Sequence, residues 1–300
     1  MAYRNLFIEN PARISLRNYQ LLIETDRIYS VPVEDISTLL IESRQSTITG
    51  AALSFLGESG VAVYVCDEKH LPCAVLLSFS SHSRELMILK NQLDCSEPMK
   101  KRLWQKIIRT KISNQAKCLE LAGKPEQAVI ISAYIDKVRS GDPQNMEASA
   151  AMKYFPLLFG LEFVRTGEDV LNASLNYGYA ILRGFIARTL AVYGFQPALG
   201  LHHRSELNRF NLADDLIEPF RPLIDLMVYS MEEFHGEVFS ADCRKLLFSC
   251  LSLDILSGGQ HHSVSYAIER MVKSLTRTLS DGKDELCLPE LLPLKLHTYE

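Results

Sequence analysis

The segment 200–222 concentrates residues whose types could do chemistry. It holds two histidines, four acidic residues and three arginines among ordinary apolar residues. Asp215 and Glu218 are three residues apart, so on a helix they would project from one face of adjacent turns. Asn211 suits the N-cap of that helix, and Pro219 predicts its kink or end. With His203 on the loop before it, an imidazole and two carboxylates could converge on a divalent cation.

The same residues also fit a purely structural role. A histidine pair in a polar loop is often solvated, and acidic residues near a helix start compensate the helix dipole. Chemistry alone does not choose between His202 and the adjacent His203 as the ligand. From the residues by themselves, both the metal-binding and the structural interpretation stay open.

The elements that must position these residues change character near residues 80–85. Before this point the apolar pattern alternates like strands, and after it the period becomes helical. This change predicts an α+β fold with a small N-terminal β-rich domain, residues 1–81, and a larger all-α C-terminal domain, residues 82–300. Strands are expected over 6–8, 13–17, 20–25, 28–33, 38–42, 61–65 and 74–78, with a helix over 47–56. Further helices are expected over 85–93, 98–123, 125–140, 146–155, 171–193, 214–230, 243–256 and 263–280.

Two upstream segments complete a series of three motifs. Residues 146–155 form a Glu-x-x-x-Ala-x-x-Tyr-Phe pattern that begins at Glu147, and 176–184 reads Asn-Tyr-Gly-Tyr-Ala-Ile-Leu-Arg-Gly. Together with Gly-x-x-His at Gly200 and Asp-Leu-x-Glu-Pro-Phe-Arg-Pro at 215–222, this series resembles the CRISPR-associated integrase family of spacer acquisition, the first of the Cas proteins. The Gly-Leu-His-His loop and the Asn-Leu-Ala-Asp-Asp-Leu sequence are similar to members from type II systems.

The resemblance implies a catalytic site and its cation. It assigns Glu147, His203 and Glu218 as metal ligands, with His203 chosen over its neighbour by register. Asp215, one turn before Glu218, would orient a ligand or a metal-bound water. Hard carboxylates favour Mg²⁺ or Mn²⁺, and the imidazole suits Mn²⁺. The helical domain, 82–300, would then be catalytic.

The activity implied is that of a metal-dependent DNA endonuclease and integrase of CRISPR adaptation. Such an enzyme joins the 3′-hydroxyl ends of a short prespacer duplex into the repeat array by strand transfer, and with water as nucleophile the same site hydrolyses. A branched-DNA repair nuclease and a structural DNA-binding subunit are the alternatives. Arg204, Arg209 and Arg221 are candidates for holding DNA phosphates.

The resemblance also implies partners. Members of the family form homodimers through the β domain, here residues 1–81. Two dimers flank a dimer of the small companion Cas protein in a heterohexameric adaptation complex that binds prespacer and repeat DNA. Type II members work beside the effector nuclease and an accessory adaptation protein.

Composition narrows the class of protein. The net charge of −4 argues against a uniformly basic nucleic-acid coat, yet residues 81–125 hold ten Lys and Arg against four acidic residues. This segment could follow phosphates or be a solvated helix face. Seven cysteines without a Cys-x-x-Cys pattern, no signal-peptide core and no apolar run of 18 residues predict a cytoplasmic protein without a membrane span. His261 and His262 are expected in an exposed turn, and Trp104 in helix packing.

Overall fold

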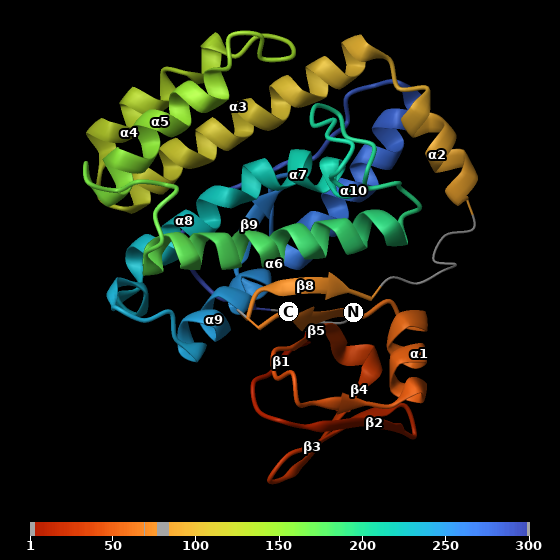
Figure 1. Ribbon diagram of the computed structural model, residues 1–300. Coiled ribbons are helices and arrows are strands. Elements are labelled where there is room, and N and C mark those ends of the chain that lie inside the picture. Colours follow the sequence, from red (N-terminus) through yellow and green to blue (C-terminus); the bar gives the residue numbers. More distant parts are fainter. Residues whose placement is uncertain (1–3, 69, 77–83, 299–300) are drawn as a thin grey trace. The chain divides into compact units, whose positions relative to one another are not determined.

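The computed structural model describes residues 4–68, 70–76 and 84–298, and it divides the chain into two compact units. The first unit is 1–83 and the second is 84–300, so the division falls two residues after the predicted boundary. The first unit is built mainly of strands and the second mainly of helices (Figure 1), which is the predicted α+β class. The end of the strand predicted over 74–78 and the residues at the boundary, 77–83, lie outside the described residues.

In its described residues, 4–68 and 70–76, the first unit contains two four-stranded sheets and one α-helix. One sheet has the order β1-β5-β7-β8 and the other β4-β3-β2-β6. The strands are β1 (Arg4–Ile8), β2 (Arg13–Arg17), β3 (Gln20–Glu24), β4 (Ile28–Pro32), β5 (Ile36–Ile41), β6 (Thr47–Ile48), β7 (Ala62–Cys66) and β8 (Pro72–Val75), with a 3-10 turn η1 (Val33–Asp35) before β5. Strand β5 pairs in parallel with β1 and with β7, and its buried apolar run suits a strand with a neighbour on each side.

Helix α1 (Gly50–Glu58) packs against β2 of one sheet and β7 of the other. Thr49 caps it, because its side chain accepts a hydrogen bond from the backbone N–H of Ala52. The core below it is apolar, and it includes Ile14, Leu39 and Leu56, none of which has exposed surface. Of the helix predicted over 47–56, the first two residues instead form the short strand β6.

The second unit is built around the long helix α3 (Glu97–Leu121), beside which α4 and α5 lie (Figure 1). The other helices are α2 (Glu85–Leu93), α4 (Pro125–Ser132), α5 (Met146–Phe159), α6 (Val170–Val192), α7 (Asn211–Ile217), α8 (Arg221–Ser230), α9 (Ala241–Phe248) and α10 (Val264–Asp281). Short 3-10 segments are η2 (Ile135–Lys137), η3 (Glu218–Phe220), η4 (Glu232–His235) and η5 (Ser249–Ser252). None of the helices in the described residues is both long enough and apolar enough to span a membrane.

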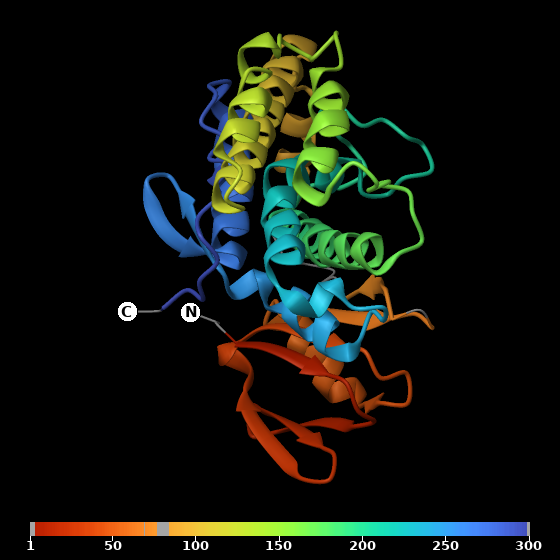
Figure 2. The same ribbon diagram turned by 90° about the vertical axis from the view of Figure 1, so that its left-hand side faces the viewer.

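The prediction of an all-α second domain is wrong in one place. The helix predicted over 243–256 ends at Phe248, and β9 (Asp254–Ser257), β10 (Gln260–Ser263) and β11 (Pro289–Glu290) form a three-stranded sheet. Figure 2 shows β9 and β10 of this sheet as a blue hairpin. Gly258 and Gly259 both have positive φ angles, 60° and 74°, and they form the two-residue turn between β9 and β10. A two-residue turn of this kind favours a β-hairpin, so the end of the apolar run before it forms strand β9 and not the predicted helix.

Three other helices differ from the prediction by three or more residues at one end, and one of them, α5, continues four residues beyond its predicted end at 155. The helix predicted over 125–140 stops at Ser132 and is followed by η2. The helix predicted over 214–230 begins at Asn211 and continues as α7, η3 and α8, with the 3-10 turn at Pro219, which has no backbone donor. Asn211 is therefore a helical residue and not the N-cap. Its side-chain amide donates to the backbone carbonyls of Ala198 and Ser205 instead.

Candidate metal centre

Glu147 stands in the first turn of α5, and two side chains outside the helix hold that turn. The carboxylate of Asp142 accepts hydrogen bonds from the backbone N–H groups of Met146, at 2.9 Å, and Glu147, at 3.0 Å. The side chain of Asn145, the N-cap residue, accepts from Ala148 N–H. These contacts satisfy backbone donors that a helix start leaves without partners, so they fix where the Glu147 side chain leaves the helix.

Glu218 lies at the 3-10 turn between α7 and α8, and it is buried. Arg221, one turn further on, donates from Nε to Glu218 Oε1 at 2.8 Å. The other oxygen, Oε2, is buried and accepts no hydrogen bond of good geometry from any residue that the structure describes. It is balanced instead by an ion pair with the ammonium of Lys111, at 2.5 Å.

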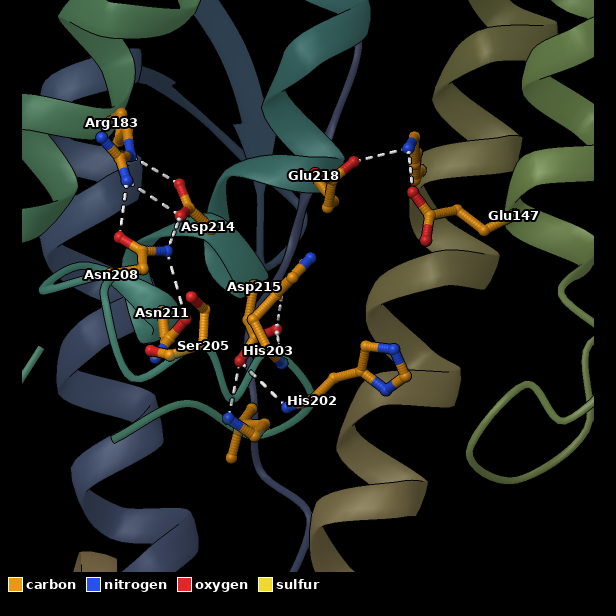
Figure 3. Close-up of polar contacts among 12 residues, drawn as sticks. Glu147, Arg183, His202, His203, Ser205, Asn208, Asn211, Asp214, Asp215 and Glu218 are labelled. Atoms are coloured by element: carbon orange, nitrogen blue, oxygen red, sulfur yellow. Dashed lines mark hydrogen bonds and ion pairs between the residues drawn. The ribbon is translucent and has the colours of Figure 1, made fainter. Parts of the chain in front are cut away.

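Lys111 joins the two glutamates. Its Nζ atom lies 2.6 Å from Glu147 Oε1 as well as 2.5 Å from Glu218 Oε2, so one ammonium is shared by two carboxylates (Figure 3). The helix α3 that carries Lys111 packs against both α5 and η3. Two elements that are distant in the sequence therefore place their carboxylates around one positive charge.

The charges of Glu218, Lys111 and Arg221 interact strongly and shift each other's pKa values. Burial by itself would raise the pKa of Glu218, but the adjacent Lys111 and Arg221 cations lower it to about 2. Burial would lower the pKa of Lys111, and the two glutamates outweigh this effect and raise it. At neutral pH both Glu218 and Lys111 are therefore ionised, as a buried pair must be to remain stable.

Asp215 organises the histidine loop. Its buried carboxylate accepts hydrogen bonds from the backbone N–H groups of Leu201, at 2.6 Å, and of His202 and His203, each at 3.1 Å. The ring Nδ1 of His203 lies 2.7 Å from Asp215 Oδ1 (Figure 3). The loop must pass very close to this carboxylate, and only glycine permits that at position 200. A Cβ atom at Gly200 would lie 2.4 Å from His203 O and 2.8 Å from Asp215 Oδ2.

The two histidines have different surroundings. The His202 ring stacks on the buried Trp104 of α3, with ring centroids 4.2 Å apart and an interplanar angle of 1°. The His203 ring meets the same indole edge-on and points its Nδ1 at Asp215. That hydrogen bond raises the pKa of His203 and selects the tautomer with a proton on Nδ1. Nε2 of His203 makes no hydrogen bond to a described residue, so its lone pair is available to a ligand.

The four predicted site residues thus form two pairs in the structure. Glu147 and Glu218 share Lys111, and His203 is joined to Asp215. Among the described residues, no three His, Cys, Asp or Glu side chains gather closely enough to hold a metal ion. The donor types still fit Mg²⁺ or Mn²⁺, since two carboxylates and an imidazole held by a carboxylate are ligands of these ions. What lies between the carboxylates is the Lys111 ammonium.

Most of the other residues singled out in the sequence have partners, whereas Arg209 is exposed and forms no ion pair with a described residue. Arg204 pairs with Glu97 at 2.6 Å, and Arg221 with Glu218. Several cations of the basic segment also form ion pairs, namely Lys106 with Asp284, Arg109 with Asp136, and Lys117 with Glu120. His261 and His262 are on β10, and not in a turn, with His261 Nδ1 2.7 Å from Asp254.

Two residues that sequence reasoning missed support the site. One is Lys111. The other is the buried Asp225 of α8, which accepts hydrogen bonds from Tyr154 of α5, at 3.0 Å, and from Tyr179 of α6. Arg221 lies over the Tyr179 ring, 4.6 Å from its centroid. Asp225 therefore ties the helix of Glu147 to the helix that follows Glu218. The sequence feature that could have revealed both residues is a charged side chain that follows buried apolar positions of the same helix. Ile107 and Ile108 precede Lys111 in this way, and Leu223 and Ile224 precede Asp225.

Comparisons with known proteins agree with this fold. The chain is 46% identical over 305 aligned residues to the CRISPR-associated endonuclease Cas1 of Neisseria meningitidis serogroup C (strain 8013), an alignment that covers 100% of both chains. The solved structure of a casposase bound to integration product matches with a TM-score of 0.75 at 20% identity, covering 95% of this chain and 92% of that one. A Cas6-RT-Cas1–Cas2 complex matches with a TM-score of 0.70 at 19% identity, over 94% of this chain and 36% of that chain.

The sequence profile of a single family matches residues 6–235, which span the histidine loop and all four predicted site residues. This match extends over well more than half of the chain, and the Neisseria relative aligns over its full length. The chain belongs to the family described as CRISPR associated protein Cas1.

Proposed function

We propose that this chain is a divalent-metal-dependent DNA endonuclease and integrase of CRISPR adaptation. It would join the 3′-hydroxyl ends of a short prespacer duplex to the repeat array by phosphodiester strand transfer. The observation that carries the proposal is the pair Glu147 and Glu218, two carboxylates from different helices that already share one cation. The Neisseria relative is named an endonuclease, and the similar casposase is bound to an integration product, and both support this reaction class.

Each residue of the site would have its own role in this reaction. Glu147, Glu218 and Nε2 of His203 would hold Mg²⁺ or Mn²⁺, and the bound ion would polarise the scissile phosphate and lower the pKa of the attacking hydroxyl. Asp215 would keep the His203 ring in its ligating tautomer. Arg221 would hold the Glu218 carboxylate in place through its 2.8 Å hydrogen bond.

We further propose DNA and a small companion Cas protein as partners. One structural neighbour is a complex that contains Cas1 together with Cas2, which supports the companion. The dimerisation role of the β-rich unit is part of the same proposal, with two homodimers flanking the companion dimer in a heterohexamer. Sedimentation of the purified chain, alone and with the companion, measures this directly, and a chain that remains monomeric in both samples would contradict it.

The test of the activity is strand transfer of a prespacer duplex into a repeat-bearing plasmid, with the companion protein and Mn²⁺ or Mg²⁺. Glu147→Ala and His203→Ala should each abolish transfer, while Asp136→Asn, at an exposed ion pair in the same unit, should leave it unchanged. Full transfer by either site variant would contradict the assignment of the site.

A structural DNA-binding subunit is the second candidate, because Lys111 and Arg221 already neutralise the acidic residues as a scaffold would require. Titration with Mn²⁺ separates the two functions. A scaffold would show no cation binding that depends on Glu218, whereas the enzyme should lose its binding in Glu218→Ala.

A further inference from the structure

Lys111 is unusual in its surroundings. Its side chain is only 8% exposed, and a lysine is almost never buried to this extent unless its charge is paired. Its ammonium contacts one oxygen of Glu147 and one of Glu218, at 2.6 and 2.5 Å. On the same face of α3, one turn away in either direction, the positions are all buried: Ile107 and Ile108 before Lys111, and Asn114 and Gln115 after it. The ammonium therefore has no route to solvent along its own helix and is directed to the two carboxylates.

Two carboxylates at such close range need a cation between them. Without one, the two negative charges would repel each other and the carboxylates would move apart. Of the two glutamates, Arg221 forms its ion pair with Glu218, so it does not bring the glutamates together. The ammonium of Lys111 is the group that contacts both of them among the described residues.

A divalent cation bound by both glutamates would need the same space. Mg²⁺ lies about 2.0–2.1 Å from its oxygen ligands. The oxygens available to it, Glu147 Oε1 and Glu218 Oε2, are those that the ammonium contacts. An ion placed between them would lie within a few ångströms of Nζ, and the two positive charges would repel each other strongly in this buried setting.

We propose that Lys111 is the internal counter-cation of the metal-free site, which holds Glu147 and Glu218 together until a divalent cation displaces its ammonium. The inference rests on the proposed function, since it presumes a cation that binds these carboxylates. Lys111 is a positioning residue in this scheme. It opposes metal binding, and it holds the two carboxylates close together through its contacts with Glu147 and Glu218.

The first experiment compares Lys111→Met with Lys117→Met and the unaltered chain. Lys117 lies on the same helix, its side chain is 46% exposed, and it forms an ion pair with Glu120, so it is a matched control for loss of one lysine. Mn²⁺ affinity is measured by calorimetry, and unfolding temperature is measured with and without Mn²⁺. Lys111→Met should unfold at a lower temperature without metal, bind Mn²⁺ at least about tenfold more tightly (about 1.4 kcal/mol) and gain more stability from it. Lys117→Met should behave as the unaltered chain does.

Equal or weaker Mn²⁺ binding by Lys111→Met would overturn the inference. Glu147→Ala keeps that result distinct from failure of the proposed function. If the unaltered chain binds Mn²⁺ and Glu147→Ala does not, the metal site stands and only the role of Lys111 falls. If the unaltered chain binds no Mn²⁺, both fall.

A second measurement needs no Lys111 variant that folds. In the ¹⁵N-lysine-labelled chain, a buried, ion-paired ammonium should give a slowly exchanging Nζ resonance, which is followed during titration with diamagnetic Mg²⁺. Displacement predicts that this resonance shifts or disappears in step with metal binding, while the signals of exposed lysines remain. A Lys111 resonance that stays unchanged at saturating Mg²⁺ would refute displacement.

Discussion

Asp215→Asn tests whether one carboxylate builds the histidine loop. The substitution keeps the size of the side chain but replaces one oxygen with an NH₂ group. Each carboxylate oxygen now accepts two hydrogen bonds, Oδ2 from Leu201 and His202 and Oδ1 from the backbone and ring of His203. Whichever way the amide turns, its NH₂ group faces two donors, so at least two charge-assisted hydrogen bonds are lost.

The cost follows from the burial of the site. Hydrogen bonds to a charged group contribute about 1.5–3 kcal/mol each, and Asp215 has no exposed surface through which water could replace them. Asp215→Asn should therefore lower the free energy of unfolding by about 3–6 kcal/mol. It should also weaken Mn²⁺ binding about 10–100-fold, because the tautomer of His203 is no longer held.

Urea unfolding and Mn²⁺ calorimetry measure the two effects, and Trp104 reports on the loop. Trp104 is the only tryptophan of the chain, it is buried, and its ring stacks on His202. If the loop loosens, acrylamide should quench the indole fluorescence of Asp215→Asn more strongly than that of the unaltered chain. Asp136→Asn is the control: the Asp136 side chain is 93% exposed and forms an ion pair with Arg109, so the substitution should cost no more than about 1 kcal/mol. The reasoning is refuted if Asp215→Asn unfolds within about 1 kcal/mol of the unaltered chain with the same Mn²⁺ affinity.

Three further perturbations follow from the same geometry. Glu218→Gln removes the anion paired with Arg221 and one of the two anions around the buried Lys111, so it should cost about 3 kcal/mol in urea unfolding. The exposed Glu120→Gln should cost less than about 1 kcal/mol, and similar losses in both would contradict the buried pairing. Burial outweighs the hydrogen bonds to Asp225 and raises its pKa to about 6, above its unfolded value of 3.8. Between these two pH values the folded chain therefore holds a proton on Asp225 that the unfolded chain has lost. Stability relative to Asp225→Asn should therefore fall by about 3 kcal/mol as the pH rises from about 4 to about 6, and parallel pH curves for the two proteins would rule this out. Gly200→Ala puts a Cβ atom against the loop backbone and should lower both the unfolding temperature and the Mn²⁺ affinity. Gly236→Ala, at a glycine with negative φ and open space around it, is the control for an unspecific effect, and an unchanged Gly200→Ala protein would show that the loop has room.

The motif residues could be recognised in the sequence because their roles are local. Gly200, Asp215 and the loop histidines lie within a short stretch, and a helix start followed by a proline constrains how they meet. The pairing of His203 with Asp215 crosses only 12 residues. The helices around them were also predictable, since their apolar period is long and regular, while the hairpin at Gly258 was not, because strand pairing there depends on a partner strand.

By itself, the sequence determined the change from strands to helices along the chain and which short stretch carries the histidine and the acidic residues, because these depend on neighbours along the chain. Only the tertiary structure decided that Lys111, 36 residues before Glu147, inserts its ammonium between the two glutamates, and that Asp225 joins α5, α6 and α8. Such contacts depend on the rotation and register of helices packed against one another. Periodicity shows which face of a helix is buried, but it does not show which charged side chain on a neighbouring helix that face will meet.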